Sequence, residues 1–309
     1  MAQPKTGLFG LAKATVRDFL KDDCIAAAAA LSYYTIFSLP ALLILILLLL
    51  GSVMDPRDVQ GELEAQIQGL MGASAADQVR TILAQAKRPG GGLLPTVLGI
   101  AALLFGATGA FAQLQRTLNR TWNVAPDPAR GGFKAFLLKR LFSFGMILVI
   151  GFLLLVSLAI SAVLSALGDR LTAFLPSGVS EPLLQAINLA ISLAVATLLF
   201  AAMFKTLPDA RIGWRSVWIG AAVTALLFVL GKFLIGFYLG QSNPGEAYGA
   251  AGSLIIMLLW VYYTAIILLF GAEFTENWAE LRGQGIEPEP GAVRVRQVRH
   301  QVGELGRAG

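Results

Sequence analysis

The chain contains six stretches that are long and apolar enough to cross a lipid bilayer. They fall near residues 26–51, 93–113, 141–167, 183–204, 217–239 and 251–272. A helix needs about 20 apolar residues to cross the hydrocarbon core of a membrane. Of the 309 residues, 56% are hydrophobic and 14% are charged, whereas soluble domains carry roughly 25% charged residues. The sequence therefore predicts an all-α, polytopic integral membrane protein with six transmembrane helices.

The positions of the basic residues predict how these six spans are oriented. Of the 24 Lys and Arg residues, 18 lie in four segments, 5–21, 116–140, 205–215 and 282–307. These segments all fall on one side of a six-span bundle. Because the side richer in Lys and Arg normally faces the cytoplasm, we expect both termini to be cytoplasmic. The basic residues that flank the spans then explain the net charge of +5, and no nucleic-acid partner is expected.

Three segments outside the spans have patterns of their own. Residues 8–21 place Lys13, Arg17 and Lys21 four residues apart beside apolar positions, which is typical of an interfacial helix, although a helix packed under the bundle would show the same pattern. The outer loop 53–92 contains apolar residues at helical spacing, which predicts two short amphipathic helices. Residues 1–281 thus form the membrane domain, and we expect 282–309 to be a flexible, basic tail.

One lysine falls inside a span. Lys232 in "FVLGKFLIGFYLG" lies about eight residues from the outer end of the fifth span. A charge at that depth is costly and is a functional hypothesis by default. Its ammonium could instead reach the outer headgroups along its own stem. Glu246 in the following loop is the nearest candidate for an ion-pair partner.

Acidic residues flank the last span and the first. Glu273 closes the last span in "FGAEFTEN", where it is either solvated or paired with a basic residue such as Arg116 or Arg120, because a carboxylate at a helix C-terminus opposes the helix dipole. Asp22 and Asp23 precede the first span and suit its N-cap.

The first span divides at Pro40 into two unlike halves. Tyr34, Thr35 and Ser38 precede the proline and a leucine run follows it. Pro40 lacks the backbone N–H of a helical residue, so a kink is expected there. The polar residues before it are better explained by helix contacts or by a polar groove than by anchoring.

Aromatic and small residues mark the last two spans. The aromatic residues Tyr248, Trp260 and Tyr263 lie before or within the sixth span, and the polar tips inside it need a partner or a wet cavity. Glycines such as Gly109, Gly231, Gly236 and Gly240 allow helix backbones to approach closely, so packing is their expected role.

Four segments together resemble the YihY/BrkB family of bacterial inner-membrane proteins. They are "AAAAALSYYTIFSLPALLILILLLLG" preceded by "DD", "LQRTLNRTWNV", "LPDARIGWRSVWIGA" and "YGAAGSLIIMLLWVYYTAIILLFGAEF". The resemblance extends from about residue 10 to 280. It implies a six-span, multi-pass protein of the bacterial inner membrane with a poorly defined activity, for which transport of lipidic envelope material is the usual suggestion. Some family members have carried a ribonuclease label.

Two functional classes remain. A transporter or flippase-like protein would bring Tyr34, Lys232 and Tyr263 to one groove, whereas a scaffold for envelope-assembly partners would be a close-packed bundle. Catalysis is not expected, because the single histidine, His300, lies in the tail and no acid–base pair or metal-ligand cluster accompanies it. No cofactor or metal is expected. The expected partners are membrane lipids, an envelope-assembly protein and, in a homo-oligomer, a second copy of the chain.

Overall fold

A computed structural model describes residues 7–51, 55–71, 73–86, 108–127, 145, 180–242 and 251–295. In these ranges the chain is mostly helical, with two pairs of short strands. The principal helices are α1 (Leu8–Lys21), α2 (Cys24–Leu50), α3 (Pro56–Met71), α4 (Ala73–Ala86), α7 (Ser180–Thr206), α8 (Trp214–Ser242) and α10 (Gly252–Leu281). A further helix covers residues 108–121.

Four of the described helices are long and apolar enough to cross a membrane. They contain the stretches Cys24–Leu48, Leu189–Thr206, Trp214–Ile235 and Gly252–Leu281. Such a helix satisfies its backbone hydrogen bonds internally, which a segment in lipid requires. These four helices confirm the first, fourth, fifth and sixth predicted spans. Most of the second span and all of the third, apart from Gly145, lie outside the described residues.

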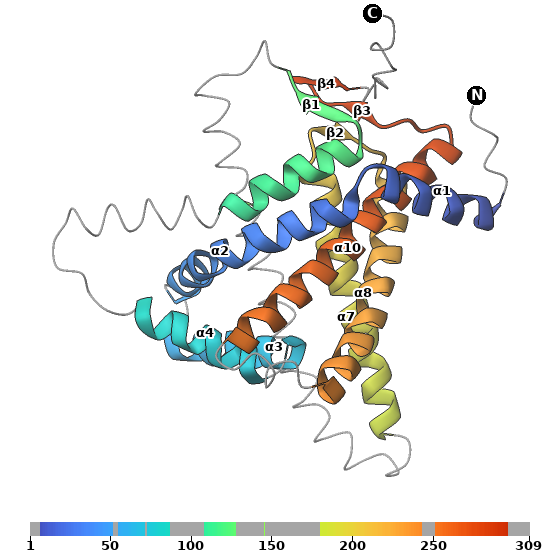
Figure 1. Ribbon diagram of the computed structural model, residues 1–309. Coiled ribbons are helices and arrows are strands. Elements are labelled where there is room, and N and C mark those ends of the chain that lie inside the picture. The colour runs from blue at the N-terminus through green and yellow to red at the C-terminus, as the bar shows by residue number, and fades with distance from the viewer. Residues whose placement is uncertain are drawn as a thin grey trace, which may run out of the picture.

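The four long helices pack in the order α7, α8, α10, α2, so that α10 lies between α8 and α2 (Figure 1). The main apolar core lies where α2, α7, α8 and α10 meet the helix 108–121. It includes Leu118, Trp122, Phe204 and Leu269, none of which is exposed. The central position of α10 explains why several of its polar residues are buried near its C-terminal end.

Helices α8 and α10 run antiparallel and approach closely at paired glycines. A Cβ atom on Gly220 would lie 2.9 Å from the Cβ of Thr275, and a Cβ on Gly271 would lie 2.9 Å from that of Thr224. Both threonine hydroxyls donate to the carbonyl of the glycine four residues earlier, at 2.7 Å. The two helices therefore carry the same G-x-x-x-T pattern and fit each threonine against the other helix's glycine.

Helices α3 and α4 form a hairpin at one end of the bundle, which confirms the two predicted short helices (Figure 1). Their apolar faces pack with the ends of α2 and α10, through residues such as Val79, Leu83, Leu47 and Met257.

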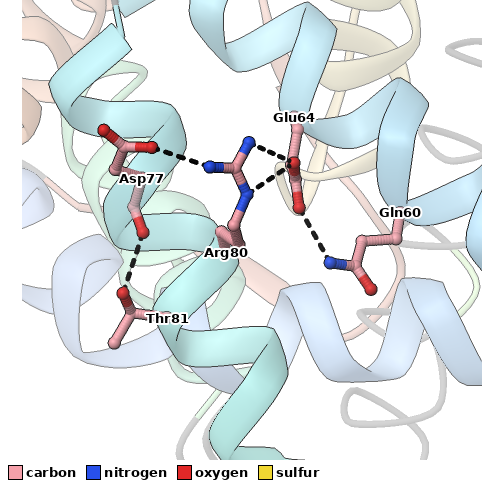
Figure 2. Close-up of polar contacts among 5 residues, drawn as sticks. All are labelled: Gln60, Glu64, Asp77, Arg80 and Thr81. Atoms are coloured by element: carbon pink, nitrogen blue, oxygen red, sulfur yellow. Dashed lines mark hydrogen bonds and ion pairs between the residues drawn. The ribbon is translucent and has the colours of Figure 1, made fainter.

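An arginine holds the two helices of this hairpin together. Figure 2 shows the Arg80 guanidinium between Glu64 of α3, at 2.9 Å, and Asp77 of its own helix, at 3.0 Å. Gln60 donates to the other oxygen of Glu64, and the Thr81 hydroxyl donates to the Asp77 carbonyl. The hydrogen bond and charge of Glu64 raise the pKa of Arg80 above its ordinary value. The hairpin is thus fixed by an apolar contact with the bundle and a polar contact within itself.

The opposite end of the bundle carries α1 and the short strands (Figure 1). Strand β1 (Val124–Pro126) pairs antiparallel with β4 (Ala292–Arg294), and β2 (Ala210–Arg211) pairs antiparallel with β3 (Glu287–Pro288). The first part of the expected flexible tail is therefore paired with two connections of the bundle. Ile286, which is buried in the main core, gives the physical reason for this order. Residues 296–309 lie outside the described part.

Helix α1 has the features of both predicted alternatives, a helix packed under the bundle and an interfacial helix. Leu11 and Phe19 are buried, and the Phe19 ring meets the edge of Phe270 on α10 at 5.9 Å between centroids. Phe9, Val16 and Leu20 are exposed on the other side of the helix, near the exposed basic residues. One face of α1 thus packs under the bundle, while the other presents apolar and basic side chains outward.

Candidate functional site at the acidic junction

The most unusual polar site in the described chain lies where the α1–α2 connection meets α10. We call it the acidic junction, defined by Asp22, Cys24, Glu273 and Glu276. All four belong to the "DDC" and "GAEFTEN" segments of the sequence, and all four side chains are buried. Soluble and membrane interiors alike rarely bury carboxyl groups without a partner.

The connection between α1 and α2 is only two residues long and sets the position of Cys24. The Asp22 N–H donates to the Asp18 carbonyl at 2.8 Å, and Asp23 adopts a left-handed backbone conformation with φ 56°. Asp23 makes no side-chain cap bond to α2, so the predicted capping role of this residue is wrong. The turn instead directs the first residue of α2, Cys24, towards α10.

Glu273 is the centre of the junction. Its side chain has 0% exposure, and the Cys24 thiol donates to its Oε1 atom at 3.5 Å. Among the described residues its Oε2 atom has no hydrogen-bond partner. An ionised carboxylate can accept about four hydrogen bonds, so a single weak thiol donor leaves this group poorly satisfied.

No basic side chain neutralises Glu273 in the described part of the chain. Arg116 and Arg120, the expected partners, are exposed and form no ion pair with it there. The pairing of Glu273 with Arg116 or Arg120 is therefore wrong, because the helix 108–121 turns these two side chains outward while its other face packs on the bundle. The groups that act electrostatically on Glu273 are instead the acidic side chains of Glu276, Asp22 and Asp18.

The helix 108–121 and the residues after it close the junction from the side. The Trp122 indole N–H donates to the Ala272 carbonyl at 3.1 Å, next to Glu273. Thr121, at the end of this helix, is buried as well. A buried tryptophan normally finds such an acceptor, and this one fixes the helix against α10.

An Asn–Asp pair joins the same helix to the connection between α7 and α8. Asn119 donates to an Asp209 carboxylate oxygen at 2.8 Å and accepts the Asp209 backbone N–H at 2.8 Å. Gln115 donates to the other carboxylate oxygen at 3.3 Å. The segments "LQRTLNRTWNV", "LPDARIG" and "GAEF" thus meet at one end of the bundle, although they are far apart in the sequence.

The depth of Glu273 follows from the antiparallel pairing of α8 and α10. Glu273 lies midway between Gly271 and Thr275, which face Thr224 and Gly220, so it is level with about residue 222. The exposed rings of Trp214 and Trp218 at the start of α8 are of the type that gathers at a membrane interface. At 1.5 Å per residue, Glu273 lies about 6 Å further along the bundle than Trp218. The acid therefore sits within the apolar part of the bundle.

Comparison of the sequence with known proteins shows to which family the chain belongs. The sequence profile of the family described as virulence factor BrkB matches residues 15–294. The chain belongs to the virulence factor BrkB family. It is a multi-pass membrane protein, because the four described spans and its membrane-protein relatives agree.

Relatives of this BrkB-family chain have names that carry little functional information. It is 30% identical over 303 residues to a UPF0761 membrane protein of Azotobacter vinelandii, which covers 94% of this chain and 69% of the relative. It is 28% identical to a UPF0761 membrane protein of Alcanivorax borkumensis, over 84% of this chain and 58% of that relative. A Bacillus subtilis relative, 27% identical over 80% of this chain and 86% of its own length, carries the provisional name ribonuclease-like protein YfkH. No solved structure matches the BrkB-family chain.

The predicted polar residues of the first span do not gather at one place. Ser38 is buried, and its Oγ atom would lie 3.3 Å from a Cβ atom on Gly109, so it packs against the helix 108–121. Thr35 and Pro40 are half-buried, and α2 continues through the proline. Tyr34 is 43% exposed, with its ring edge against that of Tyr33.

The predicted aromatic residues of the last span pack against α8. The Tyr263 hydroxyl donates to the Leu227 carbonyl at 3.2 Å, and its ring lies where a side chain on Gly231 would be. Trp260 is buried with its ring edge near Phe228. Lys232 follows Gly231 and is half-buried. Tyr248 and Glu246 lie outside the described residues, so the proposed pairing of Lys232 with Glu246 stays a prediction.

Several residues of the site were not identified from the sequence. Cys24 carries no sequence signal, and Trp122, Asn119 and Asp209 enter the sequence analysis only as parts of two longer segments. The G-x-x-x-T spacing at 220–224 and 271–275 was a readable signal, because small residues four apart favour close helix packing. No group of metal-ligating side chains occurs within the described ranges.

Proposed function

We propose that this BrkB-family protein is a membrane transporter or flippase-like protein for a lipidic or small solute of the bacterial envelope. The observation that carries the proposal is Glu273, an acid with no exposed surface inside an apolar helical bundle. Ionisable groups placed there are expensive and usually mark a path for ions or substrates. Apolar packing holds the helices of the bundle together elsewhere, so the fold does not need an acid at this position.

The same proposal includes six spans with both termini in the cytoplasm. The exposed basic residues Lys13, Arg17, Arg211 and Arg215 support it, because they lie in α1 and around β2, at the same end of the bundle (Figure 1). The α3–α4 hairpin would then be outside. Replacing Cys24 by serine and placing a single cysteine at Lys13 or at exposed Arg57 tests this arrangement with an impermeant thiol reagent on whole cells. Only the cysteine at position 57 is expected to be labelled. If only the cysteine at position 13 is labelled, the termini face outward and the proposed orientation is wrong.

A scaffold for envelope-assembly partners is the second candidate. The packing of Tyr263 into Gly231 favours it, because this tyrosine was expected to line a groove in a transporter. Neither candidate is an enzyme. The ribonuclease-like name of the Bacillus relative belongs to that protein, and within the described ranges of this chain no group of side chains offers the metal ligands that many nucleases use.

Lipid translocation in proteoliposomes separates the two candidates. The purified full chain is reconstituted with a trace of NBD-labelled phosphatidylglycerol, and dithionite then bleaches only the outer leaflet. A transporter lets the protected inner-leaflet fluorescence decay, whereas a scaffold leaves it equal to that of protein-free liposomes. Glu273→Gln is expected to slow the decay, while Glu287→Gln, at an exposed position on β3, is the matched control. If Glu273→Gln translocates the lipid as fast as the wild type, Glu273 has no role in translocation and the transport proposal loses its support.

A further inference from the structure

Three glutamates lie along one side of the C-terminal part of α10. Glu273, Glu276 and Glu280 occupy positions i, i+3 and i+7, which fall on the same face of a helix. Their exposure rises in that order: Glu273 is 0% exposed, Glu276 is 9% exposed, and Glu280 is an exposed residue near the helix end. The three carboxyl groups therefore lead from the water-facing end of α10 into the bundle. We call them the carboxyl ladder.

The inner end of the ladder has an oxygen atom without a partner. Glu273 Oε2 is buried and accepts no hydrogen bond from the described residues, while Oε1 receives only the Cys24 thiol. Taking an isolated carboxylate out of water is far more costly than taking out the neutral acid. A bound proton on Oε2 removes that charge, and no side chain needs to move to provide it.

The surroundings of Glu273 favour a proton over a basic side chain. Asp18 acts on it from α1, Asp22 from the α1–α2 connection, Cys24 from α2, and Glu276 from α10 itself, with Glu280 acting in turn on Glu276. The basic residues of α1 and of the helix 108–121 are all exposed: Lys13, Arg17, Lys21, Arg116 and Arg120.

One of the surrounding groups has a partner of its own, because Asp18 pairs with Arg17 at 3.1 Å. Glu276 is 9% exposed and lies between the buried end of the ladder and the exposed one. Like charges held this close are relieved when one of them binds a proton.

We propose that the carboxyl ladder is a proton-binding site, in which Glu273 Oε2 holds a proton in the described conformation and Glu276 and Glu280 carry it to and from water. Each step moves one proton from a carboxyl oxygen to a carboxylate, and the proton enters from or returns to water at Glu280. The α1–α2 connection covers the inner end through Asp22 and Cys24. A role of this site in driving transport with a proton gradient rests on the proposed function.

Infrared spectroscopy of the full chain in lipid nanodiscs tests the proton on Glu273. A protonated carboxyl gives a C=O band that is separate from the amide bands and shifts in heavy water. Wild-type protein at neutral pH is expected to show such a band, Glu273→Gln to lose it, and Glu287→Gln to keep it. Absence of the band from the wild type, or its persistence in Glu273→Gln, would overturn the proposal.

A second variant tests the proposal even if Glu273→Gln does not fold. Glu276→Gln removes the middle of the ladder, so the band is expected to remain while its hydrogen–deuterium exchange slows several-fold. Exchange as fast as in the wild type would show that protons reach Glu273 by another route and would exclude the ladder.

The proteoliposome assay adds the link to transport. If the wild type moves the NBD-labelled phosphatidylglycerol, an imposed pH gradient should change its rate several-fold and leave the Glu273→Gln rate unchanged. Equal responses of the two proteins would exclude coupling through Glu273. If the wild type moves no lipid, the transport proposal fails for this substrate, while the infrared band still decides whether Glu273 binds a proton.

Discussion

Replacing Gly231 by alanine should destabilise the contact between α8 and α10. The new Cβ atom would lie 2.8 Å from Cε2 of Tyr263 and closer still to its Cζ and Oη atoms, whereas ordinary contacts are 3.4–4 Å. All three of these nearest atoms belong to one side chain. The ring is held by the hydrogen bond from its hydroxyl to the Leu227 carbonyl at 3.2 Å. The ring therefore has to leave its place for the methyl group to fit.

The expected cost has two parts. Overpacking by an extra methyl group costs typically about 1–3 kcal/mol, and losing the tyrosine hydrogen bond costs about 0.5–1.5 kcal/mol. Together they give a loss of about 1.5–4.5 kcal/mol in the free energy of unfolding. The unfolding of purified protein in mixed detergent micelles, titrated with SDS and followed by tryptophan fluorescence, measures this loss.

Gly61 provides a matched control within the same chain. It lies in α3, and a Cβ atom there would meet nothing within 4 Å. Because alanine is the better helix former by about 1 kcal/mol, Gly61→Ala should leave stability unchanged or raise it slightly. The two substitutions add the same atom to a helix and differ only in what that atom touches.

A double-mutant cycle with Tyr263→Ala tests the reasoning directly. With the ring removed, Gly231→Ala has lost all three of its close contacts and should cost little. Contacting residues are expected to couple in such a cycle, whereas distant residues contribute additively. An equal cost of Gly231→Ala in the wild-type and Tyr263→Ala backgrounds would refute the packing of this ring against Gly231.

Three further outcomes follow from the acidic junction and its surroundings. Trp122→Phe removes the donor to the Ala272 carbonyl and should lower the unfolding free energy in the SDS titration by about 1 kcal/mol. Asp209→Ala removes the carboxylate that accepts from buried Asn119 and should lower it by about 1–3 kcal/mol; no change would mean that the pair does not hold the helix 108–121 in place. Cys24 is 1% exposed and should resist N-ethylmaleimide applied from either side of the membrane, with labelling only after unfolding in SDS. Rapid labelling of the native protein would show that the junction is open.

The helices and the membrane class could be predicted from the sequence because they depend on local pattern. A run of about 20 apolar residues has no stable alternative to a spanning helix, and α2, α7, α8 and α10 lie where such runs were identified. The amphipathic spacing in residues 53–92 likewise predicted the α3–α4 hairpin. The ordered strands after Leu281 were not predicted, since β3 and β4 depend on pairing with β2 and β1, which lie at least 75 residues earlier in the chain.

Which polar residue is buried was decided only by the tertiary structure. Glu273 and Lys232 both stand out in the sequence as charges beside or within apolar spans, and the pattern favoured Lys232. In the folded chain Lys232 is half-buried, whereas Glu273 has no exposed surface, because the two-residue turn after α1 brings Cys24 against it. Sequence by itself determined the apolar helices, since each satisfies its own backbone. The buried acid required the tertiary structure, because its burial depends on helices that are far apart along the chain.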